Sequence, residues 1–186
     1  GGKVVSKDDY TGIVYESSAK GDIVSSTIYD QYKIRPLAVV GNASYNQVAY
    51  AGFEDTSQGN WSWSDGVLTT GSSKTGSRYL SLGNTGLTKS GLTTSQKYLI
   101  SFWAKSSSGS ITIDGVGTVT INSPSAWTFY EYTVTGHSSI NIRKTGATEL
   151  QLDELRLHPS RALMKTFSYH PLYLVTSETN GNNETS

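Results

Sequence analysis

The chain has 186 residues, no cysteine and a formal net charge of zero, with 15 basic and 15 acidic side chains. The balanced charge offers no positive field to attract phosphate, which argues against nucleic-acid binding, and the missing cysteine excludes disulfides and thiolate metal sites. No apolar run approaches the ~20 residues of a membrane helix, so we expect no membrane insertion. No signal peptide is visible at the start of the sequence, and any targeting signal is expected to lie outside it.

Short β-prone runs separated by turn clusters fill nearly the whole chain, and helical periodicity is almost absent. In chain order, strands are expected at residues 12–15, 25–29, 37–40, 79–82, 98–104, 110–113, 118–121, 129–134, 139–143, 150–157, 165–169 and 174–177. Asp114-Gly115 between two alternating runs predicts a hairpin. The polar clusters at residues 106–109 and 122–124 predict strand ends. This pattern is typical of an all-β sandwich.

The two ends of the chain differ from its middle. Residues 48–159 hold the most regular strand pattern, whereas residues 1–47 carry looser, tyrosine-rich strands and residues 160–186 carry two short strands. The polar tail at residues 180–186 is expected to be mobile. We therefore predict three segments: a sandwich module at 48–159, with a β-rich extension before it and a short segment after it.

Five motifs in the middle segment follow one another in the order of a known family. They are residues 51–55 (Ala-Gly-Phe-Glu-Asp, followed by Trp61), 77–82, 98–105, 127–134 and 152–157. Together they resemble carbohydrate-binding modules with the galactose-binding-like jelly-roll fold. The resemblance implies an all-β jelly-roll β-sandwich with flanking strands, on a secreted protein that binds polysaccharide without catalysis.

The same resemblance implies a structural calcium ion held by Glu54 and Asp153. Calcium is coordinated by several oxygens, which mix carboxylates with backbone carbonyls. The first and last strands of such a sandwich lie side by side, so the two carboxylates can converge, and the loop at residues 71–76 would supply carbonyls. The alternative is that both acids are solvated residues at strand edges, since that loop carries no further acid.

Aromatic side chains are the candidates for a sugar site, because their faces stack on the C–H faces of pyranose rings. Trp61 and Trp63 are two residues apart in a polar loop and would face the same side of an extended chain. Exposed, they would form a stacking platform. The alternative is that one or both cap the core.

Three more residues complete the predicted ligand-binding set. Trp127 starts a strand, where it either rims a concave face or seals the edge of the sandwich. Tyr79 is a candidate for lining a groove, with a core or sheet-surface position as its alternative, and Arg78 is a candidate partner for sugar hydroxyls. Trp103 lies in the middle of a strand whose two faces are both candidates for the core, and we place it in the core.

No constellation of catalytic residues emerges. Glycoside hydrolysis needs two facing carboxylates, but the acid pairs here, such as Asp153 and Glu154, are adjacent in sequence and point to opposite faces of a strand. The three histidines have no metal-binding spacing. The protein is therefore predicted not to be an enzyme.

The flanking segments carry a second resemblance. Residues 166–172, continued by 175–182, resemble a tyrosine–aspartate (YD) repeat of the Rhs family, although His170 stands where aspartate is usual. Upstream, residues 29–30 and 35–39 resemble the stretch before such modules in Rhs-like bacterial surface proteins. The resemblance implies a module embedded in a secreted YD-repeat protein at the bacterial cell surface. One repeat cannot bury its own face, so the flanks are expected to pack on the sandwich or on each other.

Two functions remain open at this point. The first is a non-catalytic carbohydrate-binding module that recognises a polysaccharide or oligosaccharide by aromatic stacking. The alternative is a structural or adhesive insert in a YD-repeat surface protein, with no sugar site. In either role the module is expected to be monomeric, and the exposure of its tryptophans separates the two.

Overall fold

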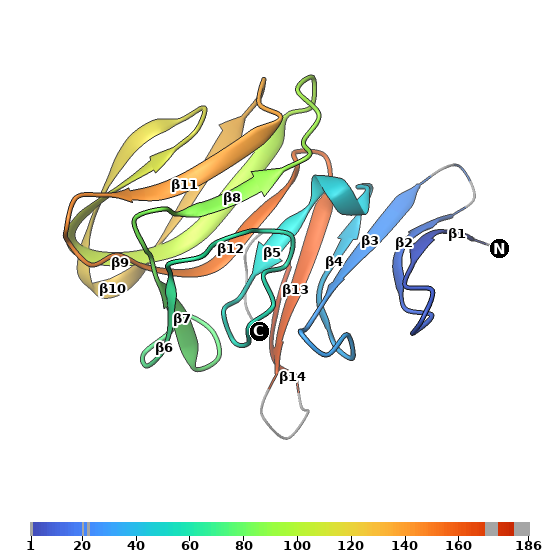
Figure 1. Cartoon of the computed structure of the whole chain (residues 1–186), viewed down its shortest axis with the longest axis horizontal. Coiled ribbons are helices and arrows are strands. Elements are labelled where there is room, and N and C mark those ends of the chain that lie inside the picture. Colours follow the sequence, from blue (N-terminus) through green and yellow to red (C-terminus); the bar gives the residue numbers. More distant parts are fainter. Residues whose placement is uncertain (1, 20, 22, 170–174, 181–186) are drawn as a thin grey trace.

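The alternating runs of the sequence form strands in a computed structural model that describes residues 2–19, 21, 23–169 and 175–180. Its elements are β1 (Lys3–Lys7), β2 (Val14–Ser18), β3 (Val24–Tyr29), β4 (Pro36–Gly41), a turn of 3-10 helix η1 (Tyr45–Gln47), β5 (Ala49–Ala51), β6 (Val67–Thr70), β7 (Arg78–Ser81), β8 (Leu87–Ser90), β9 (Tyr98–Ile113), β10 (Gly117–Val134), β11 (Ser139–Thr145), β12 (Gln151–Pro159), β13 (Leu163–Tyr169) and β14 (Val175–Thr179). The predicted all-β sandwich is confirmed (Figure 1).

The strands form two hydrogen-bonded sheets. A six-stranded sheet has the order β1-β2-β3-β4-β13-β14. An eight-stranded sheet follows the path β6-β7-β12-β9-β11-β8, with β10 beside β9 and β5 beside β12. The eight-stranded sheet thus takes its strands from between Ala49 and Pro159, while the division of the chain into three segments stays a prediction.

The two flanks of the chain meet in the six-stranded sheet. Strand β4 from the N-terminal side pairs antiparallel with β13 from the C-terminal side, with Val40 opposite Met164. The N-terminal and C-terminal strands therefore pair with each other. The YD-like positions at 170–173 and the tail at 181–186 lie outside the described residues.

Strands β9 and β10 form one long hairpin where four shorter strands were expected. The predicted strand ends at residues 106–109 and 122–124 are wrong, because both clusters lie inside these strands. The hairpin keeps its pairing through an irregularity, with register shifts on both sides of Ser123, and Ser106 Oγ accepts a hydrogen bond from the N–H of Gly109 (2.9 Å). The local turn preference of serine and glycine thus produces a bulge instead of a strand end.

This bulge lets the hairpin run through both layers of the sandwich. Residues 98–105 of β9 pair with β12, whereas residues 110–113 pair with β11. The predicted turn at Asp114-Gly115 is confirmed: the N–H of Val116 donates to the carbonyl of Ile113 at 3.0 Å, and Gly115 has a φ of 81°, which a side chain would make costly.

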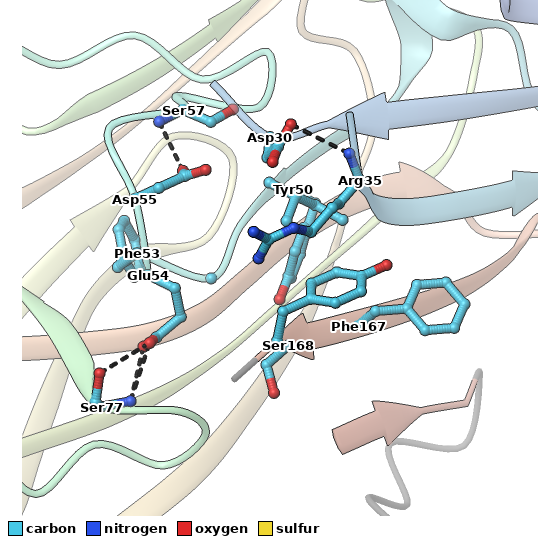
Figure 2. Close-up of a pocket in the computed structure, with 13 residues that line it drawn as sticks. Asp30, Arg35, Tyr50, Phe53, Glu54, Asp55, Ser57, Ser77, Phe167 and Ser168 are labelled. Carbon is cyan, nitrogen blue, oxygen red and sulfur yellow. Dashed lines mark hydrogen bonds between the residues drawn. The ribbon is translucent and has the colours of Figure 1, made fainter. Parts of the chain in front are cut away.

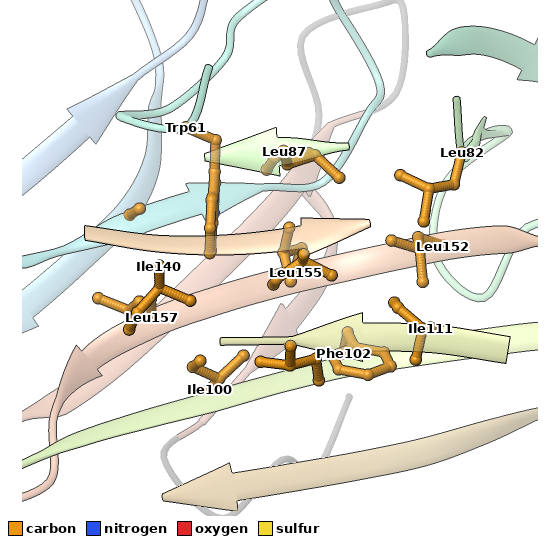
Figure 3. Packing of buried hydrophobic residues seen from close by; sticks show 14 of the residues in the cluster. Trp61, Leu82, Leu87, Ile100, Phe102, Ile111, Ile140, Leu152, Leu155 and Leu157 are labelled. Atoms are coloured by element: carbon orange, nitrogen blue, oxygen red, sulfur yellow. The ribbon is translucent and has the colours of Figure 1, made fainter. Parts of the chain in front are cut away.

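The larger of two hydrophobic cores lies between the layers of the eight-stranded sheet (Figure 3). Alternation along β9 places Ile100, Phe102 and Ala104 in it, all fully buried. Strand β12 contributes Leu155 and Leu157 to the same core. The inward-facing positions of the two strands thus follow the period of two that a half-buried strand requires.

The smaller core attaches the six-stranded sheet to the sandwich. It contains Tyr50 of β5 together with residues of β3, β4, β13 and the connections beside them, namely Ile28, Ala38, Val40, Ala43, Val48, Ala162 and Met164. Its neighbours in β5, Ala49 and Ala51, belong to the larger core. The short strand β5 therefore separates the two cores, one on each face.

The part of the chain that the structure describes contains no helix long and apolar enough to span a membrane.

Candidate functional site

Four aromatic side chains gather on the outer face of the eight-stranded sheet, away from the larger core. Trp103 of β9 and Phe129 of β10 are direct partners in the ladder, and their ring centroids are 5.4 Å apart. Tyr79 of β7 and Trp127 of β10 form a second, edge-to-face pair at 5.9 Å. All four side chains are half-buried. We call these four residues the aromatic face.

Strand alternation explains why these rings point outward. Since Phe102 and Ala104 lie in the core, Trp103 between them must point to the opposite face. Likewise Leu80 is fully buried, so its neighbour Tyr79 faces out. The prediction that Trp103 lies in the core is therefore wrong, because the core face of β9 is the one that carries Ile100.

The loop between β6 and β7 closes over this face and fixes one of the rings. The indole N–H of Trp127 donates to the carbonyl of Ser72 at 2.9 Å, which sets the orientation of the ring. The same loop is tied down from below by Asp153 of β12, whose Oδ2 accepts the N–H groups of Lys74 (2.8 Å) and Thr75 (3.1 Å). Hydrogen bonds to the loop between β6 and β7 thus fix the position of Trp127 in the aromatic face.

Two lysines lie over the rings. The Nζ of Lys74 is 4.0 Å from the ring centroid of Trp103, and the Nζ of Lys105 is 5.4 Å from that of Trp127. Beside Lys105 a shallow cavity of about 190 Å³ is lined also by Ser106, Glu149 and Gln151. The face therefore combines ring surface, two cationic groups and polar groups at its margin.

The structure separates the predicted ligand-binding residues into two groups. Trp127 and Tyr79 lie together in the aromatic face. Trp61 is only 3% exposed and belongs to the larger core, and Trp63 packs edge-on against Phe53 at 5.8 Å. The expected stacking platform of Trp61 and Trp63 is not formed, since a buried indole cannot contact a ligand. The structure instead agrees with the alternative, in which these two tryptophans pack against the core.

Arg78 lies apart from the aromatic face. It precedes Tyr79 in β7, so it points to the opposite side of the strand, and its guanidinium donates to the backbone carbonyl of Glu54 at 3.3 Å.

Two residues of the aromatic face were not predicted as ligand-binding residues. Phe129 was missed, and Trp103 was predicted to lie in the core. The polar neighbours of Trp103 at positions 101 and 105 were the available signal that its side of β9 faces outward.

A second concave site lies where the six-stranded sheet meets the loop after β5 (Figure 2). Its volume is about 190 Å³, and Asp30, Arg35, Glu54 and Asp55 bring charge to its wall. The acids among them already accept hydrogen bonds from the protein: Asp55 accepts the N–H of Ser57 at 2.8 Å, and Asp30 accepts the N–H groups at 34 and 35. The Arg35 guanidinium lies 5.4 Å from the ring of Tyr169. These internal contacts leave no ligand chemistry that we can assign to the pocket.

The two predicted calcium ligands accept hydrogen bonds from the loop between β6 and β7. Both carboxylate oxygens of Glu54 accept the N–H of Ser77 (3.1 and 3.0 Å), and one also accepts the N–H of Arg78 (2.8 Å). Gly76 has a φ of 63°, and a Cβ there would lie 2.3 Å from the carboxyl carbon of Glu54, so only glycine lets the loop wrap this carboxylate so closely. Burial raises the pKa of Glu54, while these donors lower it.

Asp153 is fully buried, whereas Glu54 is half-buried. Besides the two donors of the loop, its Oδ1 accepts the N–H of Glu154 at 2.8 Å. Burial and the charge of Glu154 raise the pKa of Asp153 well above its usual range, and the three backbone donors act in the opposite direction.

No protein-family model and no curated protein matches the chain. Solved structures of carbohydrate-binding modules with a β-sandwich fold do. One is the C-terminal CBM6 of a marine laminarinase from Zobellia galactanivorans, at 16% identity, covering 60% of this chain and 98% of that one with a TM-score of 0.43. Another is a CBM6 of lichenase 5A from Cellvibrio mixtus in complex with cellotriose, at 22% identity, 61% and 98% coverage and a TM-score of 0.40.

A third is a family 35 carbohydrate-binding module from Clostridium thermocellum, at 15% identity, covering 66% of this chain and 98% of that one with a TM-score of 0.39. These likenesses are of fold alone.

The donors around Glu54 and Asp153 do not fit a calcium ion. Calcium needs oxygen lone pairs, but here the loop presents N–H groups, whose positive ends point at the very oxygens that would bind the cation. Among the described residues no group of three or more acidic or histidine side chains is placed to hold a metal. The calcium site therefore stays a prediction that this geometry does not favour.

We expect chelation to leave the stability of the fold unchanged, because backbone N–H groups already satisfy both carboxylates. The melting temperature, followed by circular dichroism, should be the same in excess EDTA and in millimolar calcium, whereas a protein that binds a ligand only when folded is stabilised by it. A rise of several degrees with calcium would restore the predicted Glu54–Asp153 site.

Proposed function

We propose that the protein is a non-catalytic carbohydrate-binding module that holds a polysaccharide or oligosaccharide against the aromatic face. The observation that supports this best is the grouping of Tyr79, Trp103, Trp127 and Phe129 on one outer face, with every ring half-exposed. Aromatic surface of this kind matches the apolar C–H faces of pyranose rings. The polar groups beside it offer partners for hydroxyls.

The placement of the rings suits an extended sugar chain. Trp103 and Phe129 belong to neighbouring strands, and Tyr79 and Trp127 form a second pair beside the loop that carries Ser72. Two ring pairs on one face give more than one stacking position. A chain of several sugar units would therefore gain contacts that a single sugar cannot, and we propose a polymer rather than a monosaccharide as the ligand.

The surroundings of Asp153, the acid paired with Trp103 in the ladder, support a binding role over a hydrolytic one at the aromatic face. Its carboxylate is buried and accepts hydrogen bonds from three backbone N–H groups, so it is not placed to attack or protonate a ligand on the surface. We also propose, from the sequence resemblances, that the module acts outside a bacterial cell as part of a YD-repeat-like surface protein.

One observation favours the alternative of a structural or adhesive insert. The two flanks form a single six-stranded sheet that is fastened to the sandwich by the smaller core. A module built this way would also serve as a rigid spacer between neighbouring segments of a longer protein. That role needs no sugar site, so the two proposals separate on binding.

The test is affinity electrophoresis of the purified chain through gels that contain plant, algal or microbial polysaccharides, followed by calorimetry on any glycan that retards it. We expect retardation by at least one polysaccharide and weaker binding of its short oligosaccharides. If no glycan in a broad set retards the folded protein, the binding proposal fails and the structural insert is favoured.

A further inference from the structure

The cationic groups over the aromatic face point to the charge of its ligand. Lys74 reaches over Trp103 from the loop between β6 and β7, and Lys105 reaches over Trp127 from β9. Both side chains are half-buried. Among the ion pairs that join described residues, none includes either lysine. Two positive charges thus sit on the aromatic face without a carboxylate partner.

The acidic groups nearest to these lysines do not neutralise them. Asp153 lies opposite Trp103 in the ladder, but its oxygens accept three backbone N–H groups beneath the surface. Glu149 borders the cavity beside Lys105 and accepts a hydrogen bond from Gln151 at 3.0 Å. Glu131 follows at the far side of the face, two positions along β10 from Phe129. The centre of the face is therefore positive and its acids lie below it or at its rim.

The position of the ammonium groups makes the face discriminate between ligands. A sugar ring can stack on Trp103 or Trp127 only where the lysine moves off that ring, which forfeits the cation–π attraction. A neutral sugar gives nothing back for this loss. An acidic sugar supplies an anionic oxygen that the displaced ammonium can bind through a strong hydrogen bond between charged partners. The long, flexible lysine stem allows this movement.

We infer that the aromatic face selects an anionic polysaccharide, one whose sugars carry carboxylate or sulfate groups, and that Lys74 and Lys105 are the residues that set this preference. The inference rests on the proposed sugar-binding function. In the bound state the sugar faces stack on the rings, and each ammonium group lies beside the stacked unit and pairs with its acidic substituent.

The experiment compares glycans that differ only in charge. Polygalacturonate is paired with its carboxyl-reduced form, and a sulfated carrageenan with its desulfated form, so that the two arms distinguish carboxylate from sulfate. Binding is measured by calorimetry for the native chain and for Lys74→Gln, Lys105→Gln and the double variant. Lys97→Gln, which changes an exposed lysine before β9, is the matched control, and each variant is checked for an unchanged circular dichroism spectrum.

We expect the native chain to bind at least one anionic glycan about tenfold more tightly than its neutral partner. The double variant should lose most of that difference, and Lys97→Gln should keep it. Raising the salt concentration from about 0.1 M to about 1 M shortens the Debye length from about 10 Å to about 3 Å. This should weaken the binding of the anionic glycan and leave the binding of any neutral glycan unchanged.

The outcomes separate the inference from the function on which it rests. Equal binding of charged and neutral partners, or anionic binding that both lysine substitutions leave unchanged, overturns the inference and leaves the sugar-binding function in place. If the chain binds none of these glycans and none of the wider polysaccharide set, both the inference and the sugar-binding function are overturned.

Discussion

Trp103→Ala is expected to weaken glycan binding by about tenfold to thirtyfold, since losing the stacking surface of one indole costs about 1.5–2 kcal/mol of binding free energy. Trp103 is half-exposed on the aromatic face and is fixed by its contact with Phe129. The substitution removes ring surface without opening the larger core. The dissociation constant for the best glycan of the screen, measured by calorimetry, checks this.

Trp63→Ala is the matched control for this prediction. Trp63 is also a half-buried tryptophan, but it packs on Phe53 of the larger core and is not part of the aromatic face. We expect it to lose stability and to keep its affinity, whereas Trp103→Ala keeps most of its stability and loses affinity. The reverse result, with binding lost only in the Trp63 variant, would move the site back to the loop that the sequence indicated.

Most strands were predictable because apolar and polar residues alternate along each of them. The errors come where pairing between segments distant in sequence decides whether a strand continues. The polar cluster at residues 106–109 has every local mark of a turn, yet Ser106 and Gly109 pair with Ser123 and Ile121 of β10. The sequence also gave no sign of β1, since Val4 and Val5 are both exposed at the edge of the six-stranded sheet. Such an edge strand shows no buried face in its residue pattern.

The aromatic site was only half predictable for a related physical reason. Trp61 and Trp63 stand among polar residues, so their surroundings in the sequence indicate exposure. In the structure the N–H and C=O groups of Ser62 pair with Thr88, which draws the loop onto the sandwich and its flanking Trp61 into the core. Trp103 shows the opposite error, because a tryptophan in a buried strand favours the core until the partner strand fixes which face is inside.

The two sheets are joined by a buried polar network whose loss should destabilise the whole fold. The guanidinium of Arg156 donates to Glu154 at 2.7 Å and to the hydroxyl of Thr166 in β13 at 2.8 Å. Glu154 also accepts the hydroxyl groups of Tyr50 (2.7 Å) and Thr75 (2.8 Å). One ion pair thus touches β5, β12, β13 and the loop beside the aromatic face.

Glu154 occupies this position at a conformational cost. Its φ is 53°, in the left-handed region that non-glycine residues rarely adopt and that costs on the order of 1 kcal/mol or more. The residue lies in a bulge, since the register of β12 against β9 shifts between Asp153 and Arg156. The hydroxyl of Thr166 also donates to Glu154 at 3.3 Å, so the carboxylate has four partners, which offset this cost. The bulge directs the carboxylate toward the six-stranded sheet.

We therefore expect Arg156→Met to lower the free energy of unfolding by about 3–5 kcal/mol, because it leaves the carboxylate of Glu154 buried without its cation. Urea unfolding followed by tryptophan fluorescence measures this. Arg143→Met is the control: the side chains of its ion pair with Asp114 are 43% and 34% exposed, against 5% and 4% for Arg156 and Glu154, so its loss should cost about 1 kcal/mol or less. An equal loss of unfolding free energy in the two variants would show that the buried ion pair stabilises the fold no more than the exposed one.

The double variant Glu154→Gln with Arg156→Met separates the ion pair from the hydroxyl contacts. If the cost of Arg156→Met comes from an unpaired buried charge, removing that charge should recover part of the lost stability, so the two substitutions together should cost less than their sum. Additive costs would instead assign the effect to packing against Thr166. The backbone N–H of Thr75 in this network also donates to Asp153, the ladder partner of Trp103. The single variant Arg156→Met is therefore further expected to loosen the loop that orients Trp127, and hydrogen exchange at residues 72–77 would detect that coupling between fold and site.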